Sequence, residues 1–201
     1  MADNLNKTRM RDTRILMGLT LLAGLLADTA FPAGSGGHLL MQVIGYVLLT
    51  VCAIGRIYVS TFIGGVKNEQ LVTSGPYSLV RNPLYFFSLC GAAGVGFMTT
   101  SFLCLFVIVG GFYFIYDKLI AREEDFLGAK FGASFDEYKR NVPRLLPSLK
   151  GYNAPEELVF QPRYLNKAVL DAVWWFAPLP VFLLVERLKF SGAFDAPLTL
   201  F

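Results

Sequence analysis

The chain has 201 residues, of which 54% are hydrophobic and 16% charged, and its net charge is +3. Soluble globular domains carry about 25% charged residues, so this composition excludes a disordered protein and argues against an ordinary soluble one. The charge is too small to indicate a nucleic-acid partner. The cysteines lie in separate apolar runs, without the spacing of a metal site or a disulfide framework, so we expect small buried side chains and no metal. They are Cys52, Cys90 and Cys104.

A polar, basic segment, residues 1–14, precedes an apolar run over residues 15–31. As a helix this run is about 26 Å long, close to the thickness of a membrane core. It lacks the small-x-small cleavage site of a signal peptide, which favours an uncleaved first transmembrane helix. A short glycine-rich turn follows. We assign no functional role to the lone His38 after it.

Residues 39–63 are a second candidate span, with Arg56 near one membrane face, where a long side chain reaches the headgroups. A polar loop follows it. Pro83 then opens a new apolar stretch, as proline does at the first turn of a helix. The polar triplet at residues 99–101 interrupts this stretch. We therefore expect a hairpin of two rather short spanning helices over residues 83–116.

Residues 117–150 are the most charged region, and we expect them outside the bilayer. A last apolar run covers residues 166–185. Pro178 and Pro180 lie within it and predict a kinked or broken helix. The sequence leaves open whether this run spans the membrane or only enters it.

The sequence thus predicts an all-α integral membrane protein with about five transmembrane helices and cytoplasmic loops. We expect a single membrane domain over residues 1–201. Its parts are residues 1–63 (two helices), 64–150 (the region with the candidate motifs) and 151–201 (a C-terminal extension). With the N-terminus in the cytoplasm and Arg56 counted inside, the Lys and Arg residues fall on the cytoplasmic side, in agreement with the positive-inside rule. Only Arg187 and Lys189 fall outside, and only if the last helix spans. Compactness favours a bacterial inner membrane.

The loop before Pro83 carries the first candidate motif. Its Gly-Pro-Tyr turn is rigid, and Arg81 and Asn82 stand directly before a helix start. Such starts present free backbone N–H groups and a partial positive charge, and Asn82 is a good N-cap. The alternative is an interfacial loop in which Tyr77, Tyr85 and Arg81 anchor at the headgroups.

The second candidate motif is the pair Glu123 and Glu124. If the helix of the hairpin continues through residue 117, both stand one turn beyond an aromatic surface at membrane level. The alternative is a solvated helix end. Acids near a helix C-terminus oppose its dipole, so either the helix restarts or the acids have partners. On one membrane face, the two motifs can line a pocket open to cytosol and lipid.

These motifs resemble a known family. The segments LVTSGPYSLVRNPLY (71–85), EEDFL (123–127), FG (131–132) and YKRNVPRLLP (138–147), with an apolar hairpin between the first two, are similar to the isoprenylcysteine carboxyl methyltransferases, which belong with the phospholipid methyltransferases. The resemblance covers roughly residues 42–150. It implies a small integral-membrane enzyme that uses S-adenosylmethionine, bound by helix ends and cytoplasmic loops rather than by a Rossmann domain.

The resemblance also implies site residues. Cofactor contacts fall on Glu69, Gln70, Leu71, Val72, Tyr77, Asn82, Pro83, Leu84, Tyr85 and Glu123. The usual signature is Arg-His-Pro-x-Tyr, and Asn82 replaces its histidine; an amide can donate and accept hydrogen bonds but cannot act as a base. For catalysis we expect Arg81 to bind a carboxylate of the cofactor or an anionic acceptor. Glu124 is the candidate base for an amine or thiol acceptor.

The leading hypothesis is a methyltransferase acting on a lipophilic acceptor, a carboxylate, thiol or amine of a lipid or prenylated molecule that enters from the bilayer. One alternative is a nicotinamide-dependent membrane reductase of the related sterol-reductase type. Another is a non-catalytic scaffold with a decayed site, which Asn82 supports. The retained Tyr77, Arg81, Tyr85 and Glu123 argue against the scaffold.

Overall fold

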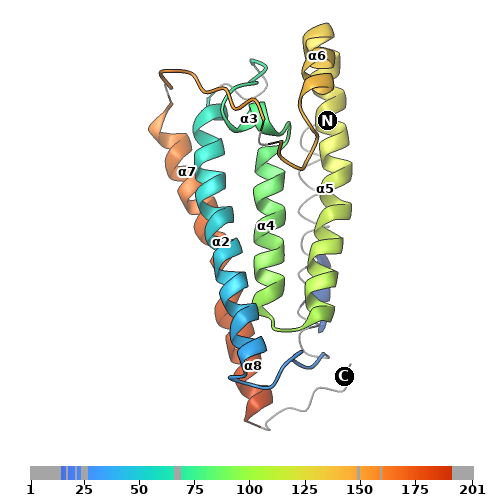
Figure 1. The fold of residues 1–201 in the computed structure, drawn as a ribbon, viewed down its shortest axis with the longest axis vertical. Coiled ribbons are helices and arrows are strands. Elements are labelled where there is room, and N and C mark those ends of the chain that lie inside the picture. Colours follow the sequence, from blue (N-terminus) through green and yellow to red (C-terminus); the bar gives the residue numbers. More distant parts are fainter. Residues whose placement is uncertain are drawn as a thin grey trace. The chain divides into compact units, whose positions relative to one another are not determined.

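The computed structural model describes residues 15–16, 18–20, 22–23, 27–65, 69–148, 150–158 and 160–191. This part of the chain is helical, without strands, and Figure 1 shows its elements. They are α2 (Gly36–Ile63), α3 (Pro76–Leu79), α4 (Pro83–Met98), α5 (Phe102–Phe131), α6 (Ala133–Asn141), α7 (Pro162–Val173), the 3-10 turn η1 (Trp174–Phe176) and α8 (Leu179–Phe190). The expected first helix is described only in part, and its described residues up to 23 are helical; residues 1–14 lie outside the described chain.

Three segments of the described chain are long and apolar enough to cross a membrane: α2, α5 and the segment from α7 to α8. Many of their apolar side chains are exposed, including Leu40 at 59%, Phe106 at 73% and Leu184 at 59%. Such a surface suits lipid rather than water. The chain is therefore a multi-pass membrane protein, and its last apolar segment has the length and composition to span.

Helix α5 differs from the expectation of a short helix. It has 30 residues and runs through the charged segment to Phe131. The reason is local, because residues 117–127 are rich in Ala, Leu, Arg, Glu and Lys, which are strong helix formers. Glu123 and Glu124 therefore lie on the same helix as the apolar run before them.

The expected breaks in the helices are confirmed. Residues 99–101 form the tight turn between α4 and α5, with Thr100 at φ 51° and the Thr99 hydroxyl donating to the Gly96 carbonyl over 2.6 Å. The prolines divide the last segment, because Pro178 lies at the start of α8 after the 3-10 turn. Proline cannot continue the preceding backbone hydrogen bonds.

The chain divides into two compact units. Unit 1 comprises residues 1–50, 89–115 and 175–201, and unit 2 comprises residues 51–88 and 116–174. Helices α2, α4 and α5 each contribute to both. All the candidate site residues belong to unit 2.

Close backbone packing and one polar cluster characterise unit 1. A Cβ atom on Gly94 would lie 2.9 Å from the Leu49 backbone nitrogen and 3.0 Å from the Gly45 carbonyl oxygen, so α2 and α4 pack backbone to backbone here. In the cluster, Glu186 accepts a hydrogen bond from the Thr100 hydroxyl at 3.0 Å. His38, to which the sequence assigned no role, is buried with its Nε2 3.4 Å from the Glu186 carboxylate.

Candidate functional site

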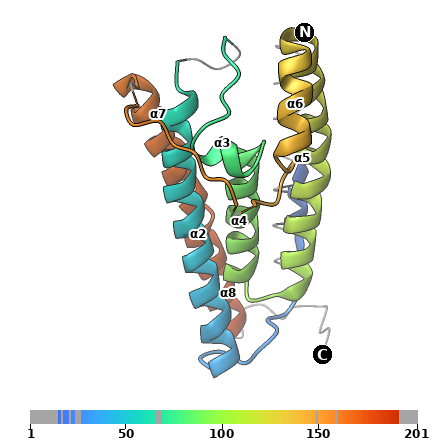
Figure 2. The same ribbon diagram turned by 45° about the horizontal axis from the view of Figure 1, so that its top comes forward.

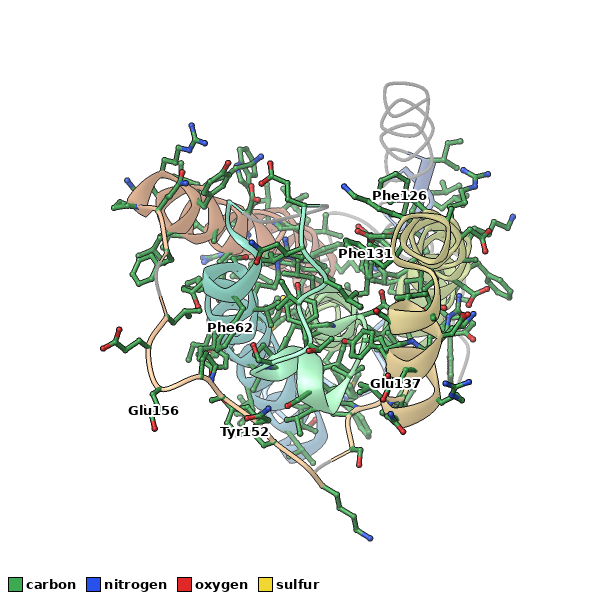
Figure 3. All side chains as sticks on the ribbon, turned by 90° about the horizontal axis from the view of Figure 1, so that it is seen from above. Phe62, Phe126, Phe131, Glu137, Tyr152 and Glu156 are labelled. Carbon is green, nitrogen blue, oxygen red and sulfur yellow. The ribbon has the colours of Figure 1, made fainter. Side chains whose placement is uncertain are left out.

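Gly75 shapes the turn that begins the site. Its φ is 60°, a conformation that glycine adopts without steric cost. A Cβ atom there would also lie 2.2 Å from Cε1 of the Phe62 ring. Figure 3 labels Phe62 on α2. The turn leads directly into the single helical turn α3, which starts at Pro76.

Helix α3 is held by α6. Tyr77 is buried, and its carbonyl accepts a 2.7 Å hydrogen bond from the hydroxyl of Tyr138. Burial raises the pKa of Tyr77 well above its ordinary value, and the nearby Glu123 charge raises it further. Burial also raises the pKa of Tyr138. Both hydroxyls therefore keep their protons at neutral pH, and Tyr138 stays a donor.

The segment after α6 runs alongside α3, and Figure 2 shows it passing across that helix. The Pro143 carbonyl accepts from the backbone N–H of Arg81 at 2.8 Å, and the Asn153 carbonyl accepts from Gly75 at 2.6 Å. Further along, Figure 3 shows Tyr152 on this segment and Glu156 where it turns towards α7. We call residues 143–153 the strap. It fixes the backbone before α4 from a region distant in sequence.

Arg81 joins α4, α5 and the end of α6. Its Nε donates to Oε1 of Glu124 at 3.0 Å, and its Nη1 donates to the carbonyls of Lys139 and Val142, each at 2.8 Å. Its side chain is only 9% exposed. The guanidinium is thus engaged on several sides within the protein.

The side-chain amide of Asn82 donates to the same carboxylate oxygen as Arg81 does. Its Nδ2 donates to Oε1 of Glu124 and to the Arg144 carbonyl, both at 3.0 Å. Its own carbonyl accepts from the backbone N–H groups of Tyr85 and Phe86 at the start of α4, as an N-cap residue does. Asn82 therefore links the start of α4 to both α5 and the strap.

The two adjacent glutamates have different surroundings. Glu124 is 8% exposed and faces Arg81, Asn82 and the Nε of Arg144 at 3.7 Å. Glu123 is half-buried and accepts a 2.8 Å hydrogen bond from the hydroxyl of Tyr85. The helix does not restart before these glutamates, and their charges, which oppose the helix dipole, have partners instead.

An aromatic pair borders Glu123. The rings of Tyr85 on α4 and Tyr116 on α5 lie 5.3 Å apart between centroids. Their π faces can attract a cation. A carboxylate beside aromatic rings is a suitable environment for a positively charged group.

The pair of Arg144 and Asp117 received no role from the sequence. Nη1 of Arg144 donates to Oδ1 of Asp117 at 2.5 Å, and Nη2 donates to the Asp117 carbonyl at 3.1 Å. Their side chains are 37% and 39% exposed. The only sequence signal for Arg144 was its place in the segment 138–147.

The remaining predicted residues lie in the loop and in an apolar cluster. Val72 and Leu84 pack against buried Val59, Phe62 and Tyr77. Leu71 is half-buried and Pro83 buried.

Glu69 and Gln70 are exposed. Among the described residues they make no hydrogen bond or ion pair with the charged cluster, by which we mean Arg81, Asn82, Glu123, Glu124, Asp117 and Arg144. The structure therefore brings together Arg81, Asn82, Tyr85, Glu123 and Glu124, and leaves the start of the loop outside this set.

Comparisons with known proteins indicate the same family as the sequence motifs. The family model for phospholipid methyltransferases matches residues 35–134. The cobalt-zinc-cadmium resistance protein CzcN of Cupriavidus metallidurans is 32% identical over 180 residues, which cover 90% of this chain and 83% of that protein. The nickel-cobalt-cadmium resistance protein NccN of Alcaligenes xylosoxydans xylosoxydans is 30% identical over 66% of this chain and 62% of its own length.

The protein-S-isoprenylcysteine O-methyltransferase of Xenopus laevis is 35% identical over 91 residues, 43% of this chain and 32% of that protein. No solved structure matches the chain. The matched residues 35–134 contain both the Arg-Asn-Pro helix start and the glutamate pair. The chain belongs to the phospholipid methyltransferase family.

Proposed function

We propose that this protein is a membrane methyltransferase that uses S-adenosylmethionine and methylates a lipophilic acceptor. One observation carries the proposal. Residues from two segments distant in sequence, 81–85 and the strap at Arg144, converge on the adjacent glutamates of the spanning helix α5. S-adenosylmethionine supplies an electrophilic methyl group on a cationic sulfur.

Glu123, Tyr85 and Tyr116 suit such a ligand. The Glu123 carboxylate is half-buried and hydrogen-bonded to Tyr85, so it is oriented and offers negative charge to a sulfonium or a ribose hydroxyl. The neighbouring rings add a face attractive to cations. We propose that this corner binds the donor.

We propose positioning roles for Arg81, Asn82 and Glu124. Their contacts are to one another and to the backbone at residues 139–144, so their effect on chemistry passes through geometry. Methyl transfer requires nucleophile, methyl carbon and sulfur in a line, and such positioning contributes up to about 7–11 kcal/mol. With Glu124 facing two arginines, it is a poor candidate for a general base.

This arrangement favours an acceptor that needs no base. A carboxylate acceptor is already ionised at neutral pH. Its oxygen attacks the methyl carbon, the carbon–sulfur bond breaks, and the bonding electron pair stays on sulfur. We propose that the acceptor enters from the lipid, because the cluster lies at the ends of membrane helices. Turnover of water-soluble acceptors only would contradict this route.

The decisive experiment measures S-adenosylmethionine binding to the protein purified in detergent, with a nicotinamide cofactor titrated in parallel. We expect saturable binding of the methyl donor alone, weakened at least about tenfold by Glu123→Gln because a charged partner of the ligand is lost. Glu137→Gln, an exposed glutamate on α6, is the matched control. Nicotinamide binding would support the reductase alternative. Binding of neither ligand to a folded sample would support the scaffold.

We also propose that the methyl transfer serves resistance to divalent metal ions. The relatives CzcN and NccN, named for such resistance, align over 90% and 66% of this chain. Among the described residues no group of three or more His, Cys, Asp or Glu could hold a metal ion, so the proposed role is enzymatic rather than metal binding. Deleting the gene should increase sensitivity to cobalt and cadmium, and a Glu123→Gln copy should fail to restore resistance.

We propose that the site faces the cytoplasm of a bacterial inner membrane. The support is the excess of Lys and Arg expected on that side of the membrane. A reporter fused after residue 150 should report a cytoplasmic location. A periplasmic signal from that fusion would reverse the proposed orientation.

A further inference from the structure

Glu124 faces two arginines that differ in how far they are engaged. Four of the five N–H groups of Arg81 have acceptors in the protein, and the side chain is 9% exposed. The side chain of Arg144 is 37% exposed, and its two terminal nitrogens donate to Asp117, whose side chain is 39% exposed. Arg81 is therefore fixed within the protein, whereas Arg144 is accessible to a ligand.

The Arg144–Asp117 pair can open at little cost. Ion pairs between solvent-accessible side chains contribute little to stability, because water solvates both partners when they separate. The backbone beneath Arg144 is fixed, since the Arg144 carbonyl accepts from Asn82 and the Pro143 carbonyl from Arg81. The backbone that carries this guanidinium is thus fixed, while the charge partner of the guanidinium can be exchanged.

The location connects this pair to the proposed donor site. Asp117 follows Tyr116, whose ring packs on Tyr85, and Tyr85 bonds to Glu123. Arg144 approaches the other carboxylate, Glu124. Arginine binds a carboxylate with a two-pronged fit, and an aspartate binds an ammonium. Side by side they match the carboxylate and ammonium of one α-amino acid.

We propose that Arg144 and Asp117 recognise the amino-acid end of the methyl donor, Arg144 taking its carboxylate and Asp117 its ammonium. The inference rests on the proposed function, since S-adenosylmethionine carries this zwitterion. It gives the carboxylate-binding role to Arg144 rather than to Arg81. An anionic acceptor is the other carboxylate that Arg144 could bind, so the test uses the donor without any acceptor.

The test compares S-adenosylmethionine with its decarboxylated analogue by binding to the full-length protein in detergent. We expect Arg144→Ala to weaken S-adenosylmethionine binding about ten- to hundredfold, the range for a hydrogen bond to a charged group. The analogue should lose less than about threefold, because it has no carboxylate for Arg144 to hold. Arg140→Ala, an exposed arginine at the end of α6, is the matched control.

A second variant separates folding from recognition. Arg144→Lys keeps the charge but loses the fork, so it should retain the thermal midpoint and still lose part of the preference for the carboxylated ligand. Equal losses for both ligands in Arg144→Ala would overturn the inference and leave the proposed function intact. Unchanged binding of both ligands in Arg144→Ala would also overturn it and point to an acceptor carboxylate instead. No binding to the wild-type protein would overturn the proposed function itself.

Discussion

Two glutamates, the half-buried Glu186 in unit 1 and the buried Glu124 in unit 2, are held in different ways. Glu186 accepts from the neutral donors Thr100 and Gln42 and lies 3.4 Å from an imidazole nitrogen of His38. Glu124 faces two guanidinium groups and one amide. A cluster with few full charges tolerates the loss of one, whereas a dense ion-pair cluster does not. Unit 2 is therefore the electrostatically sensitive part of this protein.

Replacing each glutamate by glutamine tests this difference most directly. Glu124→Gln leaves two arginines facing an uncharged amide and should lower the free energy of unfolding by about 3 kcal/mol. Glu186→Gln keeps an acceptor for Thr100 and should cost about 1 kcal/mol. Thermal midpoints in the same detergent measure both. Equal shifts would show that the two clusters do not differ in this way.

The turn at Gly75 gives the next largest effect. Gly75→Ala places a Cβ 2.2 Å from the Phe62 ring and should destabilise unit 2 by about 2 kcal/mol, combining steric overlap with left-handed strain. Gly132→Ala is the matched control, because Gly132 has a similar φ of 53° but nothing within 4 Å of a Cβ. It should cost about 1 kcal/mol, from the strain of a positive φ alone. Similar losses would show that backbone strain alone determines both results.

The Tyr138 hydroxyl gives a smaller effect. Tyr138→Phe leaves the Tyr77 carbonyl without its donor and should cost about 1 kcal/mol. Thermal melting of the variant at neutral pH measures this cost. An unchanged midpoint would mean that another group satisfies the Tyr77 carbonyl.

Alkaline pH should give the smallest effect. The pKa values of Tyr77 and Tyr138 are raised in the folded protein, so the unfolded chain loses these protons first. Their stabilising contribution is complete below the unfolded pKa of about 10 and declines as pH rises above it. Melting curves from pH 7 to 11 should show this decline, and Tyr138→Phe should reduce its slope. A midpoint that is constant up to pH 11 would contradict it.

Much of the fold could be predicted from the sequence because hydropathy and turn residues act locally. The apolar runs, the break at residues 99–101 and the disruption by Pro178 all follow from short-range chemistry. The length of α5 could have been predicted as well, since its charged part consists of helix formers. The charged residues after position 116 instead led us to expect that the helix ends there.

The site was predictable only in part. The motifs around Arg81 and Glu123 carry the family resemblance, but no periodic pattern shows which of two adjacent glutamates faces the arginines. The Arg144–Asp117 pair joins residues 27 positions apart, and nothing in either local sequence indicates the other. His38 and Glu186 were missed for the same reason, since they are 148 positions apart.

The strap has a consequence for the order in which this protein assembles. Its Asn153 and Pro143 carbonyls bond to the backbone of Gly75 and Arg81, which the ribosome makes some 60 to 80 residues earlier. The spanning helices α2 and α5 are complete before the strap exists. A nascent chain stopped before residue 143 should therefore sit in the membrane with its helices inserted but its charged cluster open. Synthesis of the strap is the step that closes it.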